Sequence, residues 1–203
     1  MQIARVSGNP LYDTHRLSGA AIAAQTLRFF VNPVGSSADG FTPKTLAETG
    51  SLSQGLSNGT AFVINAFGVY IRKADANKPA AIDDAVETYQ DISDIMRNSV
   101  VQFEQGSDLQ TYGPAEFYSG GAGVSGANIG YDNGAAAVGV AAVANGSTDR
   151  RSLYKLPEPI RLEDGTSFAW NLRVTRDVAL QQAASKYDVS ILLWGVQVQR
   201  IQP

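Results

Sequence analysis

Alternation of apolar and polar side chains is the feature that most restricts what this chain can fold into. In residues 166–174, the large apolar residues Phe168, Trp170, Leu172 and Val174 alternate with Ser167, Ala169, Asn171 and Arg173. A period of two puts the first four on one face of a β-strand and the others on the opposite face. Strand patterns bounded by turn residues also occur at residues 26–31, 61–72, 100–112 (two short strands), 157–162 and 189–201. The sequence therefore predicts a protein built mainly of β-sheet.

Two of the longer strands carry signs of a bend. In residues 61–72 the apolar face changes once, beside Gly68, which indicates burial of both faces or a β-bulge. In residues 189–201 we expect a bend at Gly195. The predicted buried face of that strand consists of Leu192, Trp194, Val196 and Val198. The dipeptide Asp164-Gly165 is typical of a tight hairpin between the two strands that flank it.

One segment, residues 79–97, has helical periodicity. Its apolar residues recur at spacings of three and four, and they are Ile82, Val86, Tyr89, Ile92 and Met96. Pro79 suits the first turn, and Asn98 suits the C-terminal cap. The acidic residues are expected on the solvent-facing sides of this helix, and they are Asp83, Asp84, Glu87, Asp91 and Asp94. Their spacing does not match a calcium-binding loop.

The remaining segments suggest how the chain is organised. Residues 1–24 have no settled period and are interpreted as an N-terminal arm, either frayed or docked on a neighbour. Residues 119–147 are rich in Gly and Ala and are expected to form a loop insertion for subunit contact or flexibility. The fold class that fits best is all-β, with residues 25–203 as a single jelly-roll β-sandwich of about eight strands and one inserted amphipathic helix. An immunoglobulin-like sandwich fits less well, because the connections are long and uneven.

Several kinds of chemistry are disfavoured by the residues present. The chain has no cysteine and a single histidine, His15, so thiolate sites and multi-histidine metal sites are excluded. A G-x-G-x-x-G match at residues 121–126 lacks a following helical period, and a G-x-S-x-G match at residues 55–59 precedes a strand instead of a helix. We therefore expect no catalytic, cofactor-binding or metal-binding residues. Trp170 and Trp194 are predicted to pack in the core instead of forming a carbohydrate platform.

Charge and hydropathy bear on the partners. The net charge is −3, without the Lys and Arg surplus that strong binding to nucleic-acid phosphates requires. No apolar run approaches the roughly 18 residues of a membrane span. Neither nucleic-acid binding nor membrane insertion is expected.

Short strand-and-turn phrases are spread over most of the chain outside residues 119–147. They lie at residues 29–35, 44–49, 59–69, 156–162, 165–168, 192–196 and 200–203. Together they resemble the jelly-roll capsid proteins of tailless icosahedral bacteriophages. The resemblance implies a shell subunit that packs against copies of itself, often as a trimer or pseudo-hexagonal capsomer, and it implies no catalytic residues. Large members of that group carry two jelly rolls, whereas this chain has room for one, which leaves a minor capsid role open.

The function expected from these observations is that of a non-enzymatic structural virion protein, namely a capsid shell subunit. It would assemble in the host cytoplasm and reside in the virion. Its partners would be copies of itself and other virion proteins, near an internal membrane in particles that have one. Two alternatives stay open. The first is a virion decoration or receptor-binding module that recognises glycans, and the second is an enzyme on a β-sandwich scaffold.

Overall fold

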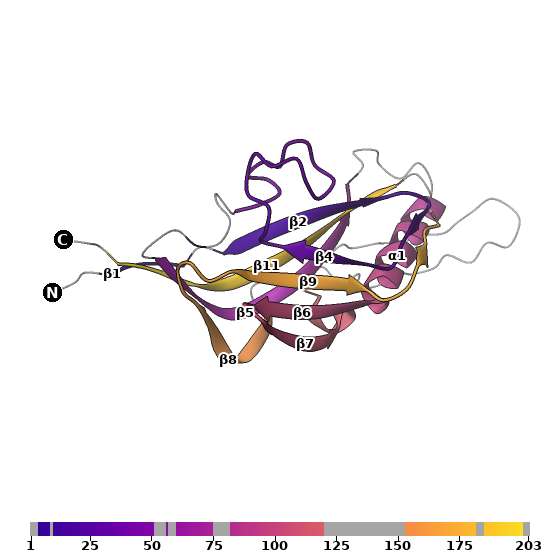
Figure 1. Ribbon diagram of the computed structural model, residues 1–203. Helices are drawn as coiled ribbons and strands as arrows, with labels where there is room; N and C mark the ends of the chain where they lie inside the picture. Colours follow the sequence, from indigo (N-terminus) through magenta and orange to yellow (C-terminus); the bar gives the residue numbers. More distant parts are fainter. Residues whose placement is uncertain are drawn as a thin grey trace, which may run out of the picture.

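The computed structural model describes residues 4–8, 10–50, 56, 60–74, 82–119, 153–181 and 185–200. Within these ranges the chain forms eleven strands, one α-helix and one short 3-10 helix (Figure 1). The strands are β1 (Ala4–Ser7), β2 (Leu11–Ser18), β3 (Ala21–Ile22), β4 (Gln25–Phe29), β5 (Thr60–Lys73), β6 (Ser99–Gln105), β7 (Asp108–Pro114), β8 (Tyr154–Leu162), β9 (Phe168–Val174), β10 (Val178–Ala179) and β11 (Lys186–Arg200). The helices are α1 (Ile82–Arg97) and η1 (Ala115–Tyr118). The prediction of a mainly β protein with one amphipathic helix is confirmed.

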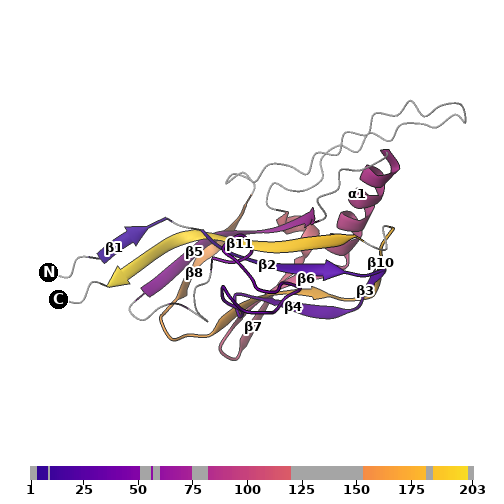
Figure 2. The ribbon, with the colours of Figure 1, turned by 90° about the horizontal axis from the view of Figure 1, so that it is seen from above.

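Two antiparallel sheets make up most of the described fold. In the first sheet β11 is central, with β5 and then β8 on one side and with β1 and β2 on the other. The second sheet has the order β4-β9-β6-β7, and β3 and β10 form a separate short pair. Figure 2 shows the two sheets as layers, with α1 at one end and the β1–β11 ribbon at the opposite end.

The strand pairs are nested along the chain. β6 pairs with β7, β5 with β8, β4 with β9, and β2 with β11, so each pair encloses the preceding one in sequence. Two further pairs, β5 with β11 and β6 with β9, join this ribbon laterally into the two sheets. As a result, the first and last long strands lie side by side although they are far apart in the sequence.

One hydrophobic core lies between the sheets. Trp170 of β9 is fully buried, and its ring centroid lies 4.4 Å from that of Phe67 in β5 and 5.2 Å from that of Phe103 in β6. The contact with Phe67 joins the two sheets across their inner faces, whereas Phe103 is the neighbour of Trp170 within the second sheet. The predicted core position of Trp170 is confirmed.

The change of apolar phase in β5 corresponds to a bulge. Opposite the step from Trp194 to Gly195, β5 advances from Ala66 to Ile64, so Asn65 is the extra residue. Phe62 and Ile64 before the bulge and Phe67, Val69 and Ile71 after it all reach the core. The bulge re-aims the strand, which is one of the two explanations that the sequence left open. It lies at Asn65, three residues before Gly68, where the change of phase was expected, and Gly195 is the residue opposite it.

The predicted face of β11 is wrong. The residues that reach the core are Tyr187, Val189, Ile191 and Leu193. Leu192, Trp194, Val196 and Val198 are half-buried on the alternate positions. Both faces of this central strand are apolar, so hydrophobicity alone did not identify the inner one. Because side chains alternate between the two faces of a strand, choosing the wrong set of alternate positions assigns every side chain of β11 to the wrong face.

The predicted hairpin at Asp164-Gly165 is also wrong. The backbone N–H of Thr166 donates to the carbonyl of Glu163 at 3.3 Å, which closes a turn, and Gly165 has a φ of 72°. However, β8 belongs to the first sheet and β9 to the second. The turn therefore carries the chain from one sheet to the other. The residues of a tight turn do not determine whether the two strands that it connects pair with each other or belong to different sheets.

The N-terminal arm predicted for residues 1–24 is replaced over much of its length by strands. β2 pairs with β11 from Leu11 opposite Leu193 to Ser18 opposite Lys186, and β1 pairs with the far end of β11. Of the predicted 119–147 insertion, only Ser119 lies within the described residues, where it forms a bridge with Val69.

Helix α1 packs at the end of the core through Ile92, Ile95 and Met96, which are buried. Asp91, predicted to face solvent, is fully buried instead. Its carboxylate accepts the Tyr187 hydroxyl at 2.6 Å and the Gln181 backbone N–H at 2.7 Å, so it fastens α1 to β11. The predicted start of this helix at residues 79–81 lies outside the described residues. In the described part of the chain, no helix is long and apolar enough to cross a membrane.

Candidate functional site: a buried charge cluster

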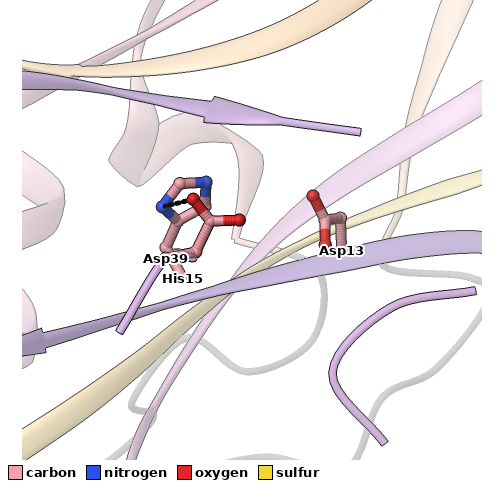
Figure 3. A group of neighbouring side chains, drawn as sticks. All are labelled: Asp13, His15 and Asp39. Atoms are coloured by element: carbon pink, nitrogen blue, oxygen red, sulfur yellow. Dashed lines mark ion pairs between the residues drawn. The ribbon is translucent and has the colours of Figure 1, made fainter. Parts of the chain in front are cut away.

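The inner face of β2 is polar where a core strand is ordinarily apolar. Asp13 and His15 are two residues apart, so they lie on the same face of the strand. Both are buried. Figure 3 shows His15 beside Asp39, with Asp13 further along the same strand. Together with Lys44, these residues form the site that we call the buried charge cluster.

Asp39 and Lys44 come from residues 30–50, which we call the 30–50 loop. This loop lies along the edge of β2 that does not pair with β11. The backbone N–H of Arg16 donates to the carbonyl of Asp39 at 2.8 Å, and that of Gly50 donates to the carbonyl of Tyr12 at 2.9 Å. The loop thereby covers an edge that would otherwise present unpaired backbone groups.

Close approach of the loop requires a glycine beside Asp39. Gly40 has a φ of 82°, and a Cβ at this position would lie 2.6 Å from the carbonyl oxygen of Arg16. Any side chain at Gly40 would push the loop away from β2. Because Asp39 is the neighbouring residue, this contact fixes the depth at which its carboxylate enters the cluster.

Lys44 is the cation of the cluster. Its Nζ donates to Asp13 Oδ1 and to Asp39 Oδ2, at 2.6 Å in each case. The side chains of Lys44 and Asp13 are both 0% exposed, and that of Asp39 is 8% exposed. Charges removed from water to this extent are tolerated only when they are paired and hydrogen-bonded. One ammonium group therefore bridges two carboxylates inside the protein.

Backbone N–H groups complete the surroundings of Asp13. The N–H of Thr14 donates to Oδ1 at 3.0 Å, and the N–H of Phe30 donates to Oδ2 at 2.6 Å. Phe30 has a φ of 69°, in the left-handed region that a large side chain seldom occupies. This conformation is found where the 30–50 loop begins and where the Phe30 N–H meets Asp13.

The carboxylate of Asp39 is held from another side by an amide. Asn32 Nδ2 lies 3.0 Å from Oδ1 and 3.1 Å from Oδ2. His15 Nδ1 lies 3.3 Å from the same Oδ1. Asp39 therefore accepts hydrogen bonds from the Asn32 amide and the Lys44 ammonium, and the His15 ring lies beside it.

His15 uses both of its ring nitrogens inside the cluster. Nε2 is 2.8 Å from the carbonyl oxygen of Arg28, which can only accept, so Nε2 carries a hydrogen. Burial lowers the pKa of His15, and this effect outweighs the opposing attraction of Asp39. With Nε2 bonded to a carbonyl and Nδ1 facing a carboxylate, neither nitrogen is available as a general base for a substrate.

Asp13, His15 and Asp39 also bring potential metal-ligating atoms close together. One potential ligand atom from each of Asp13, His15 and Asp39 lies within 4.8 Å of the others, the one such group among the described residues. However, the Lys44 ammonium already bridges both carboxylates, and it would repel a second cation at this distance. The arrangement fits an internal ion pair better than a metal centre.

Cavities lie along the contact of the 30–50 loop with the sheets. One of about 390 Å³ adjoins the cluster and is lined by residues of β2, β3 and β4 together with Asp39 and Gly40. Another, of about 350 Å³, lies near the Gly165 turn, between Phe30 and Phe168. Phe30 and Phe168 are both buried, so neither ring offers an open stacking platform.

Sequence reasoning missed this cluster. It placed His15 in an arm, and it assigned no role to Asp13, Asp39 or Lys44. The available signal was the spacing Leu11, Asp13, His15, Leu17, in which apolar residues flank two polar ones on a single strand face. The rejected motif at residues 55–59 has only Leu56 within the described residues, and the motif at residues 121–126 lies outside them.

Comparisons with protein-family models, curated proteins and solved structures found no match to this chain.

Proposed function

We propose that this protein is a structural subunit of a virion shell, built as a single jelly-roll β-sandwich. The observation that carries the proposal is the nested pairing of eight strands. β2, β4, β5, β6, β7, β8, β9 and β11 pair first with last, second with seventh, third with sixth and fourth with fifth. An antiparallel ribbon paired in this way and rolled into two sheets has the winding of a jelly roll, which is common among viral capsid domains.

The chemistry of the interior supports a structural role. The buried charge cluster has its charges paired internally, and His15 has both ring nitrogens engaged. Trp170 is fully buried, which removes it from any carbohydrate platform. The features that would favour an enzyme or a glycan-binding module are therefore weaker than those that favour a subunit which acts through its surface.

The edge strands suggest how such subunits would meet. β8 carries Pro157 and Pro159, both exposed, and a proline offers no backbone N–H to an added strand. Contact between subunits would therefore rely on side chains. The largest exposed apolar side chains include Phe117, which is 71% exposed, and Leu109 of β7, which is 57% exposed. Both belong to the β7–η1 segment, which makes it the favoured contact surface.

The test is assembly of the purified full chain, measured by light scattering and electron microscopy. We expect oligomers or closed particles at high concentration. Phe117→Asp should abolish them without changing the unfolding temperature. Leu46→Asp, at a residue that is 60% exposed on the 30–50 loop, is the matched control and should still assemble. A wild-type protein that stays monomeric at all concentrations and forms no particles would overturn the proposal.

A further inference from the structure

We propose that Lys44 and Asp13 condense to form an intramolecular amide bond, with Asp39 transferring the proton. The bond would join β2 covalently to the 30–50 loop. The inference rests on the geometry of the buried charge cluster and does not depend on the role of the protein in a virion. It gives the three residues a chemical use in addition to their ion pairs.

The first requirement is contact between nucleophile and carboxyl group. Lys44 Nζ already lies 2.6 Å from Asp13 Oδ1, and both side chains are 0% exposed. Reacting groups held in contact by a fold react as if they were present at very high concentration. The nucleophile is the amine that Lys44 becomes once its ammonium has given up a proton.

The second requirement is stabilisation of the charge that develops on the carboxyl group. The Phe30 N–H points at Asp13 Oδ2 from 2.6 Å, and the φ of 69° at Phe30 accompanies that orientation. A fixed N–H donor aimed at an oxygen that becomes negative is the arrangement of an oxyanion hole. Strained backbone is often found where a structure holds a group for a chemical purpose.

The third requirement is a group that moves a proton between the nitrogen and the leaving oxygen. Asp39 Oδ2 lies 2.6 Å from Lys44 Nζ, on the nitrogen that must lose a proton. Asn32 donates to both oxygens of Asp39 and so holds this carboxylate in place. Asp39 therefore lies where it can take the proton from the nitrogen, and Asp13, whose oxygens are held by the N–H groups of Thr14 and Phe30, is the group that is attacked.

The step balances without any outside reagent. The Lys44 ammonium gives one proton to Asp13 Oδ1, and the free amine then attacks Asp13 Cγ. A C–N bond forms, and an electron pair moves onto Oδ2. Asp39 takes a proton from the nitrogen and passes it to the Oδ1 hydroxyl, which leaves as water when the carbonyl re-forms. One C–N bond has formed, one C–O bond has broken, and Asp39 is regenerated.

The decisive experiment is mass spectrometry of the denatured full chain. We expect a mass lower by about 18 Da, one water, than the sequence requires. Trypsin should leave the chain uncut at Lys44 and release a branched peptide in which residues 6–16 are joined to residues 29–72. A folded protein with the full sequence mass, cut normally after Lys44, would overturn the proposal.

Three variants separate the roles of the residues. Lys44→Arg keeps the positive charge but supplies no amine, so its mass should show no loss of water. Lys155→Arg, at an exposed lysine of β8, is the matched control and should lose water like the wild type. Asp39→Asn should retain Lys44 and Asp13 side by side yet condense at least tenfold more slowly. Condensation at the wild-type rate in Asp39→Asn would remove Asp39 from the mechanism.

Discussion

Replacing Lys44 by methionine tests whether the buried charge cluster depends on its single cation. The substitution keeps a long, unbranched side chain and removes the ammonium group. Asp13 and Asp39 then lose the partner that lies 2.6 Å from each of them. For the ion pair alone, removal of one member costs about 3–5 kcal/mol, because the remaining charge stays in a poorly solvated site, and loss of the proposed amide bond would add to this cost.

The expected loss can be measured by chemical or thermal unfolding. For a chain of this size, about 1 kcal/mol corresponds to roughly 2–4 °C, so Lys44→Met should unfold at a temperature lower by roughly 6–20 °C. The matched control is Arg161→Met. Arg161 pairs with Glu163 at the surface, where the two side chains are 59% and 48% exposed. That pair should contribute no more than about 1 kcal/mol.

A second substitution identifies the source of the loss. In Lys44→Met, the additional change Asp39→Asn removes one of the two uncompensated charges. The double variant should therefore be more stable than Lys44→Met alone, by about 1 kcal/mol or more. Both variants lack the lysine amine, so a covalent bond cannot contribute to the difference. If the double variant is less stable than the single one, the uncompensated charges are not the cause and the reasoning fails.

Three further outcomes are expected from unfolding measurements. Burial lowers the pKa of His15 below its ordinary value of 6.5, so the unfolded chain binds a proton on this residue more readily than the folded chain. The contribution of neutral His15 to the free energy of unfolding is therefore complete above pH 6.5. It falls as the pH is lowered below that value, by at most about 1.4 kcal/mol per pH unit. His15→Gln should flatten this slope between pH 7.5 and 5.5, and an unchanged slope would assign it to other groups. Tyr187→Phe should cost about 1.5–3 kcal/mol because buried Asp91 loses a donor, and a cost below 0.5 kcal/mol would contradict that role. Gly195→Ala should destabilise the protein at least as much, because the new Cβ would lie 2.0 Å from the Val63 carbonyl oxygen; a neutral result would show that the bulge yields easily.

The strands that sequence reasoning located most directly, β5 and β9, share a face made of large apolar residues. In β9 the alternation around Trp170 shows directly which face of the strand meets the core. The bulge in β5 was anticipated for the same reason, since a change of phase within one apolar stretch indicates either an extra residue or burial of both faces. Local pattern was sufficient where only one face of a strand is apolar, and it failed in β11, where both faces are.

The elements that were missed depend on contacts between distant segments. β2 escaped detection because its inner face carries Asp13 and His15. Asp13 is tolerated there through Lys44, 31 residues away, and His15 through the Arg28 carbonyl and Asp39. The role of Gly165 was mistaken because a tight turn has the same chemistry whether its two strands share a sheet or not. In both cases the deciding information lies in the tertiary structure.

The cost of the buried charge cluster is itself an argument about its purpose. A buried ion pair contributes little to stability compared with apolar residues of the same volume, so stability alone does not explain four polar side chains beneath a sheet. Condensation of Lys44 with Asp13 removes one positive and one negative charge from the interior and leaves a neutral amide in their place. It also closes a covalent loop of 31 residues, which by the entropy of cross-linking stabilises the fold by about 3–4 kcal/mol. The bond would thus replace one buried ion pair by a cross-link, while the Asp39 carboxylate stays held by the amide of Asn32.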